Sequence, residues 1–169
     1  MIKWGVISTG NISKAFCDSI RYSKEAELAA VASRSSKNLK HFSDKYGVET
    51  YDSYNALLND STIDAIYIGT PHNSHFDLSL KTLRSGKNLL CEKPMTMNST
   101  EAMILLNESR RQNLFFMEAF MYRCHPLTHK MLEFVKQEFA NQEVLIESSF
   151  GFTADVEENH RLKNPELGG

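Results

Sequence analysis

Several residue patterns that define specialised classes of protein are missing from this sequence. Its three cysteines, Cys17, Cys91 and Cys124, lie far apart with no C-x-x-C pair, which argues against disulfides and structural zinc. No apolar run approaches the roughly 20 residues that span a bilayer, and the first residues do not resemble a signal peptide. We therefore expect reduced thiols, no membrane partner and a cytoplasmic location.

An excess of charge of either sign is also missing. The formal net charge is -2, with 24% charged and 41% hydrophobic residues, which is ordinary for a globular protein. Without a basic patch there is no case for a nucleic-acid partner. The 169 residues suffice for one domain with its own core, or for one domain and part of another.

What the sequence does contain is a regular alternation of apolar runs and helical patterns. The apolar runs occupy residues 2–7, 28–32, 48–51, 63–68, 88–92 and 114–118. Helical segments between successive strands favour right-handed crossovers and a parallel sheet. The pattern predicts an α/β fold, a Rossmann-type doubly wound parallel sheet, in a domain spanning residues 1–122.

The turn after the first run has the context of a dinucleotide-phosphate loop. It leads into a helix whose predicted inner face holds Ile12, Phe16 and Ile20. Glycine lets the backbone approach a pyrophosphate, and the helix N-terminus supplies N–H groups. Only Gly10 of a G-x-G-x-x-G pattern matches outright, so an ordinary strand–helix turn explains the residues about as well. The expected pyrophosphate contacts are Ser8, Thr9, Gly10, Asn11 and Ile12.

The end of the second run predicts the cofactor. NAD sites carry an acidic residue here for the ribose 2′-hydroxyl, whereas NADP sites carry a cation for the 2′-phosphate. This chain has Ser33 and Arg34, with no acidic residue until Asp44. We therefore expect NADP(H) to be preferred, with NAD(H) possible. The alternative is that Arg34 is an ordinary solvated side chain.

A polar cluster follows the fourth run, where ligands of an open parallel sheet bind. It contains Thr70, Pro71, Asn73 and His75, which we expect along the path from adenosine to nicotinamide. Asn73 or Ser74 can also serve simply as the N-cap of the following helix. A pair of histidines could suggest a metal, but no cysteine or carboxylate accompanies it, so we predict no metal site.

A second polar cluster, Glu92-Lys93-Pro94, ends the fifth run. A lysine fixed before proline and partly buried suits proton exchange with a substrate. Glu92 can orient the ammonium group or the nicotinamide ribose. The alternative is a surface Lys–Glu pair of little consequence.

Residues 123–169 have a different character. Pro126 suits the first turn of a helix with Met131, Leu132 and Val135 on one face. Residues 142–152 then alternate between apolar and polar, as in a strand covered on one face only. We interpret residues 123–169 as the beginning of a second α/β domain with an open, mainly antiparallel sheet, apparently cut short. The spacing of His125, His129 and Glu133 resembles metal ligands, but an exposed helix face is the favoured interpretation.

These motifs together resemble the Gfo/Idh/MocA family of NAD(P)-dependent oxidoreductases. Thr70-Pro71 with Asn73 and His75, then Glu92-Lys93-Pro94, occur in family order and spacing, and residues 120–126 and 164–169 resemble the dihydrodiol dehydrogenase branch. The resemblance implies that Lys93 is the catalytic lysine, and we add Arg123 to the expected cofactor contacts. Members are typically about twice as long, and their C-terminal sheet holds substrate and often mediates homo-oligomers. Ser8 departs from the family's usual glycine.

The resulting hypothesis is an NADP(H)-dependent oxidoreductase. It transfers a hydride between nicotinamide and the carbinol carbon of a polyol, sugar or dihydrodiol, a small-molecule substrate. The rival hypothesis is a non-catalytic NADP(H)-binding regulatory or sensing module, or an inactive truncated fragment. Turnover with any polyol would exclude the rival.

Overall fold

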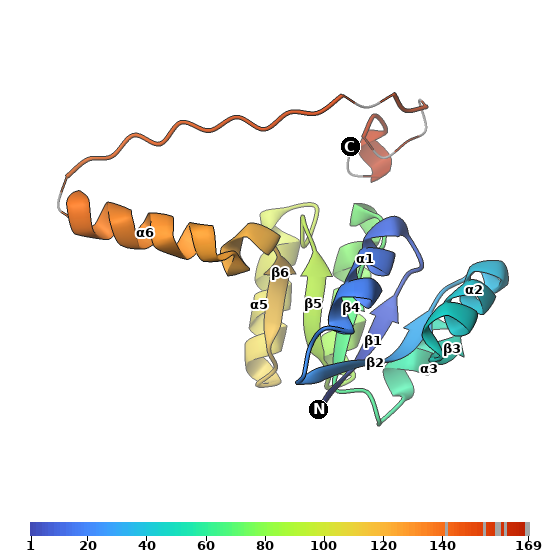
Figure 1. The fold of residues 1–169 in the computed structure, drawn as a ribbon. Coiled ribbons are helices and arrows are strands. Elements are labelled where there is room, and N and C mark those ends of the chain that lie inside the picture. The colour runs from blue at the N-terminus through green and yellow to red at the C-terminus, as the bar shows by residue number, and fades with distance from the viewer. Residues whose placement is uncertain (141, 154, 158–159, 161, 168–169) are drawn as a thin grey trace.

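The structure, a computed structural model, describes residues 1–140, 142–153, 155–157, 160 and 162–167. Its centre is a six-stranded, wholly parallel sheet in the order β3-β2-β1-β4-β5-β6 (Figure 1). The strands are β1 Ile2–Ile7, β2 Ala26–Ala32, β3 Glu49–Tyr51, β4 Ala65–Ile68, β5 Asn88–Glu92 and β6 Phe116–Ala119. The predicted Rossmann-type α/β fold is confirmed.

Helices cover both faces of this sheet. They are α1 Asn11–Ile20, α2 Ser36–Tyr46, α3 Tyr54–Asn59, α4 His75–Arg84 and α5 Ser99–Arg111. Helix α6 Pro126–Glu138 follows the last strand and lies outside the sheet, and short 3₁₀ turns occur at η1 His72–Ser74, η2 Met121–Cys124 and η3 Pro165–Leu167. One core cluster packs α1 and α2 against one face, and the other packs α3, α4 and α5 against the opposite face. Successive strand residues alternate between the two clusters, as Val6 and Ile7 do, because side chains in a strand point alternately to either face.

The chain reverses its direction of winding at β1. β2 and β3 lie on one side of β1, and β4, β5 and β6 lie on the other. In such a sheet the loops after the two strands at the reversal separate and leave a crevice at their carboxyl ends. Those strands are β1 and β4, so the loops beginning at Ser8 and Gly69 border the crevice.

Helix α1 is rotated from the predicted phase. Its buried residues are Ser13, Cys17 and Ile20, whereas Ile12 is 37% exposed and Phe16 is only partly buried. The predicted inner face is therefore wrong at Ile12. Where α1 approaches Gly69, the small Ser13 side chain comes nearest and takes the buried position, whereas Ile12 lies beside Gly69 only through Cγ2 and stays partly exposed.

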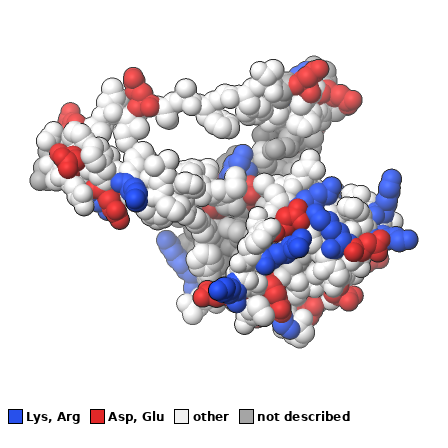
Figure 2. Space-filling view, viewed as in Figure 1, with Lys and Arg blue, Asp and Glu red and all other residues white. Residues whose placement is uncertain are grey.

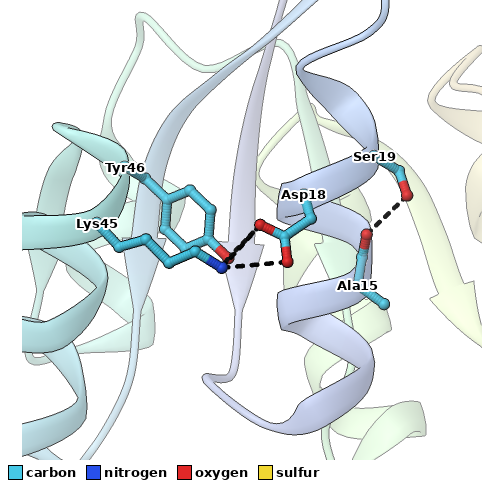
Figure 3. A network of polar contacts seen from close by, with 5 residues as sticks. All are labelled: Ala15, Asp18, Ser19, Lys45 and Tyr46. Atoms are coloured by element: carbon cyan, nitrogen blue, oxygen red, sulfur yellow. Dashed lines mark hydrogen bonds and ion pairs between the residues drawn. The ribbon is translucent and has the colours of Figure 1, made fainter.

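Helices α1 and α2 are also joined at their exposed ends. Lys45 Nζ donates to both carboxylate oxygens of Asp18, at 2.8 and 3.1 Å, and the Tyr46 hydroxyl donates to Oδ1 at 3.1 Å (Figure 3). The hydrogen bond from Lys45 is the main cause that lowers the pKa of Asp18. This network lies on a solvated edge, away from the carboxyl ends of the strands, and contributes to stability.

The region after β6 leaves the sheet. Helix α6 has no buried residue, and its apolar side chains include Leu127 at 69% and Phe134 at 56% exposure. Residues 142–153 run extended and exposed back across the top of the molecule, and they form no strand (Figure 1). The alternating pattern predicted a strand there, but a strand needs a neighbour to pair its backbone N–H and C=O groups, and none of the described residues provides one.

Charges are mixed over the visible face of the body that contains the sheet. Figure 2 shows basic and acidic side chains interspersed there, whereas the extended segment carries few charges. No helix in the described part of the chain has the length and apolar character that a membrane span requires.

Candidate functional site

Two hollows lie at the carboxyl ends of the strands, on either side of the loop after β4. The first has a volume of about 480 Å³ and lies toward α2 and α4. The second has a volume of about 530 Å³ and lies toward β5 and β6. Ser8, Thr70 and Pro71 line both hollows, so the two form one continuous crevice at the position that the reversal of the sheet predicts.

The loop after β1 turns at Ser8. This residue has φ +105°, a conformation that favours glycine, and its hydroxyl accepts a hydrogen bond from the Gly10 N–H at 3.1 Å. Gly10, as the N-cap of α1, provides no side-chain cap, so no side chain competes for the first N–H groups of the helix. Gly10, Asn11 and Ile12 line the second hollow. The N-terminus of a ten-residue helix therefore opens on the crevice, a suitable site for a phosphate anion.

Gly69 is where α1 and β4 come closest. A Cβ added to Gly69 would lie 2.5 Å from the Ser13 hydroxyl oxygen and 3.1 Å from Cε1 of Tyr67. Ser13 is fully buried, and its hydroxyl has no hydrogen-bond partner among the residues that the structure describes. The absence of a side chain at Gly69 therefore sets how closely the N-terminal end of α1 approaches the sheet.

At the end of β2, Ser33 is buried in a hydroxyl network. Its oxygen lies 3.1 Å from Thr9 Oγ1 and accepts the Ser35 N–H at 3.2 Å, while Asn38 donates its side-chain amide to Thr9 at 3.3 Å. Arg34 is exposed and lines the first hollow. The structure thus brings Thr9, Ser33 and Arg34 together, with the Ser33 oxygen already engaged by its neighbours.

Helix α4 contributes two charged residues that sequence reasoning missed. Asp77 and Lys81 both line the first hollow, opposite Arg34. They are four residues apart and therefore share a face of α4. The i, i+4 spacing of these two residues was the only feature of the sequence that could have suggested a shared role. The position of α4 over the sheet, which places this face at the crevice, cannot be predicted from that spacing.

The segment after β4 divides the predicted residues. Thr70 and Pro71 line both hollows, whereas Asn73 is exposed and lines neither. Ser74 is the N-cap residue of α4, one of the two that the sequence offered, but its side chain makes no capping hydrogen bond. The turn η1 intervenes, and the Ser74 hydroxyl oxygen instead lies 2.7 Å from the Pro71 carbonyl oxygen and 2.8 Å from Thr70 Oγ1.

His75 lies under the crevice rather than on its wall. It is fully buried, with Nδ1 2.7 Å from the Pro94 carbonyl oxygen and Nε2 2.8 Å from the Thr70 carbonyl oxygen. The imidazole therefore links the segment after β4 to the segment after β5. It supports the backbone that carries Thr70 and Lys93, and its own ring lines neither hollow.

Glu92 and Lys93 lie in the wall of the second hollow, together with the N-terminus of α1. Lys93 is exposed, so the partial burial expected of it is not found. Glu92 is half-buried, and its Oε1 accepts the Tyr67 hydroxyl at 2.7 Å. Burial, and secondly this hydrogen bond, raise the pKa of Tyr67 above its ordinary value, so the phenol remains a donor.

The rest of the second hollow comes from later segments. Met121 of η2 lines it, whereas Arg123, two residues on, is exposed and does not. His160 reaches the same hollow from the C-terminal region, and η3 lies close to η1. His72 also lines it, a further residue that sequence reasoning did not assign to the site.

Metal ligands are not gathered in the described part of the chain: no three histidine, cysteine, aspartate or glutamate side chains there are close enough to hold an ion. His125 accepts the Leu127 N–H through Nδ1 at 3.1 Å and so caps α6.

Comparison with known proteins agrees with this architecture. Residues 2–120 match the model of the Gfo/Idh/MocA oxidoreductase family, described as having an NAD-binding Rossmann fold. The chain belongs to this family.

Named relatives include two kinds of dehydrogenase. The chain is 32% identical to D-xylose 1-dehydrogenase (NADP(+)) of Hypocrea jecorina, over 99% of this chain and 48% of that protein. It is 34% identical to trans-1,2-dihydrobenzene-1,2-diol dehydrogenase of Xenopus tropicalis, over 99% of this chain and 51% of that protein. The chain thus spans about half the length of these Gfo/Idh/MocA relatives.

A solved structure also resembles the chain. It is the Y186F mutant of KijD10, a 3-ketoreductase from Actinomadura kijaniata, in complex with TDP-benzene and NADP. The TM-score is 0.77 at 31% identity, and the match covers 85% of this chain and 44% of that protein.

Proposed function

We propose that the chain is the cofactor-binding part of an NADP(H)-dependent oxidoreductase that acts on CH–OH groups. The observation that carries this proposal is that Lys93 and the uncapped N-terminus of α1 line one hollow. An anion-binding helix end beside a lysine suits a site where a phosphate-bearing cofactor and a reacting hydroxyl meet. The names of the relatives, dehydrogenases of a sugar and of a dihydrodiol, support the substrate class.

The residues of the crevice fit a phosphorylated dinucleotide. Gly10, Asn11 and Ile12 would hold the pyrophosphate through the N-terminus of α1, with Ser8 and Thr9 shaping the loop. Ser33 and Arg34 would hold the 2′-phosphate, because a guanidinium pairs with phosphate through two charge-assisted hydrogen bonds. We propose this side for NADP(H), and NAD(H) remains a possible weaker ligand.

The other predicted cofactor contacts remain proposals, and they differ in whether the residue lines the crevice. Thr70 and Pro71 lie in both hollows and would border the path from adenosine to nicotinamide. Glu92 would accept hydrogen bonds from the nicotinamide ribose. Asn73 and Arg123 are exposed and would need to reach the cofactor from outside the hollows.

The bound nicotinamide supplies hydride exchange, and the chain's own residues handle the proton. Lys93 Nζ would take the hydroxyl proton in oxidation and return it in reduction. His75 would keep Lys93 in register with the loop after β4, through the two backbone carbonyls that it links.

Residues 123–169 would be the beginning of the second, substrate-binding domain, with an open, mainly antiparallel sheet. The unpartnered apolar side chains of α6 and of residues 142–153 support this proposal, because such surfaces ordinarily pack against something. The polyol, sugar or dihydrodiol would bind between this region and Lys93, and the sheet of that domain would mediate homo-oligomers.

Replacing Lys93 with Met tests the proposal. We expect Lys93→Met to abolish turnover, followed by the absorbance of reduced nicotinamide with a panel of sugars, polyols and dihydrodiols. The Kd for NADPH should change by no more than about twofold, because the proton-exchanging group is removed and the phosphate contacts remain. A variant that keeps most of its rate would remove Lys93 from the mechanism. NADPH binding by a wild-type chain without turnover on any substrate would contradict catalysis by this chain and favour the rival, a regulatory module or an inactive fragment.

A further inference from the structure

Tyr67 is held in place from several directions. It lies in β4, is 2% exposed, and belongs to the core cluster on the α1 face of the sheet. Its ring stacks on Phe16 of α1, with centroids 4.1 Å apart and planes 1° apart. Tight packing of this kind leaves the ring little freedom, so the position of its hydroxyl is fixed by the fold.

The hydroxyl crosses from β4 to β5. Tyr67 pairs with Leu90 in the parallel register, and side chains alternate along a strand, so Glu92 lies on the same face as Tyr67. The hydroxyl donates to Glu92 Oε1 at 2.7 Å. A core side chain thereby reaches the carboxylate in the wall of the second hollow.

The other carboxylate oxygen is held as well. Oε2 of Glu92 accepts the backbone N–H of Lys93 at 3.3 Å. The Lys93 ammonium forms no ion pair in the part of the chain that the structure describes, although an acidic neighbour lies next to it in sequence. Both carboxylate oxygens of Glu92 are thus engaged by hydrogen bonds that do not involve the Lys93 ammonium.

We propose that Tyr67 is a positioning residue of the site, whose hydroxyl holds Glu92 toward the second hollow and away from the Lys93 ammonium. Glu92 is then available to accept hydrogen bonds from a vicinal diol, the chemistry of the ribose beside the nicotinamide, and Lys93 stays available for the proton. This inference rests on the proposed function and names a residue that the motifs do not contain.

Tyr67→Phe tests it, because the change keeps the ring, its stacking and its burial and removes one hydroxyl. The probes are NADPH, which contains the nicotinamide ribose, and adenosine 2′,5′-bisphosphate, which does not. We expect the Kd for NADPH to rise about tenfold, the size of one hydrogen bond to a charged group, while the Kd for the bisphosphate stays unchanged. Glu92→Ala should weaken NADPH similarly, and adding Tyr67→Phe to it should change nothing further.

A matched control exists outside the site. The Tyr51 hydroxyl donates to Asp60 Oδ2 at 2.9 Å, so Tyr51→Phe removes a similar bond and should leave both Kd values unchanged. Equal weakening of both probes by Tyr67→Phe, or no change in NADPH binding, would overturn the proposal in favour of a structural role. A wild-type chain that binds neither probe would overturn the proposed function and this inference with it, which distinguishes the two failures.

Discussion

Replacing Gly69 with Ala tests how the close approach of α1 to the sheet shapes the crevice. The added methyl would lie 2.5 Å from Ser13 Oγ, 3.1 Å from Tyr67 Cε1 and 3.2 Å from Ile12 Cγ2. Only the contact with Ser13 Oγ is shorter than 3 Å, a separation that a side-chain Cβ essentially never shows, so either the Ser13 side chain or α1 must shift. Overpacking of this kind destabilises by about 1–3 kcal/mol. At about 2 kcal/mol, a chain of this size should lose about 4–8 °C in Tm.

The partner in the clash provides an internal check. Ser13→Ala removes the atom nearest the added methyl, together with a buried hydroxyl that has no hydrogen-bond partner. Alone it should be neutral or slightly stabilising, because no unsatisfied group remains. Combined with Gly69→Ala, it should restore at least half of the lost stability, a coupling of about 1 kcal/mol.

The assay is urea denaturation of the four variants in the cycle, with Gly151→Ala as the control. No atom lies within 4 Å of a Cβ built on Gly151, so that change should stay within about 0.5 kcal/mol of wild type. Gly69→Ala should also weaken NADPH binding, because the end of α1 lines the second hollow. A stable Gly69→Ala variant, or additive effects of the two substitutions, would refute the reasoning.

Two further predictions concern titrating groups. Asp18→Asn removes a carboxylate whose pKa the hydrogen bond from Lys45 holds below its ordinary value. Its stabilisation is present above the unfolded pKa of about 3.9 and is lost as the pH falls through the folded value. The Tm difference from wild type should therefore close on acidification from neutral pH, and a constant difference would contradict this. Burial raises the pKa of Cys17 and of Cys91 to about 12, whereas Cys124 is exposed. One thiol should react rapidly with an aromatic disulfide reagent at mildly alkaline pH, and the other two only after unfolding; a second fast thiol would place a buried cysteine at the surface.

Much of the fold was predictable because apolar runs and glycine ends are local signals. The six strands, the alternating helices and the crevice after β1 and β4 follow from them. The phase of α1 did not follow, because Ile12 fits the helical period, whereas the close approach of α1 to Gly69 places the small Ser13 in the buried position. Tertiary packing therefore determines which face of α1 is buried, and the apolar period alone predicts that face incorrectly at Ile12.

Site residues that belong to a motif at a strand end could be predicted from the sequence. Contacts that depend on two elements coming together could not. Thr70, Pro71, Glu92 and Lys93 lie in the crevice as their places at strand ends suggested. The Tyr67 hydroxyl bond to Glu92 depends on the register of β4 with β5, which no local pattern states.

The strand expected at residues 142–152 shows the same limit. Its alternating pattern is intact, but a strand forms only with a neighbour, and the described part of the chain offers it none. An alternating pattern thus indicates which residues can form a strand, and a neighbouring strand is needed for it to form.

The measurement that tests the central claim most directly is a fluorescence titration of the chain with NADPH and, in parallel, with NADH. The account predicts saturable binding of both with NADPH clearly tighter, and Arg34→Ala should remove most of that difference, because the guanidinium that lines the first hollow would hold the 2′-phosphate. Tighter binding of NADH would mean that Arg34 does not hold the 2′-phosphate. Binding of neither cofactor would contradict the assignment of the crevice as a dinucleotide site.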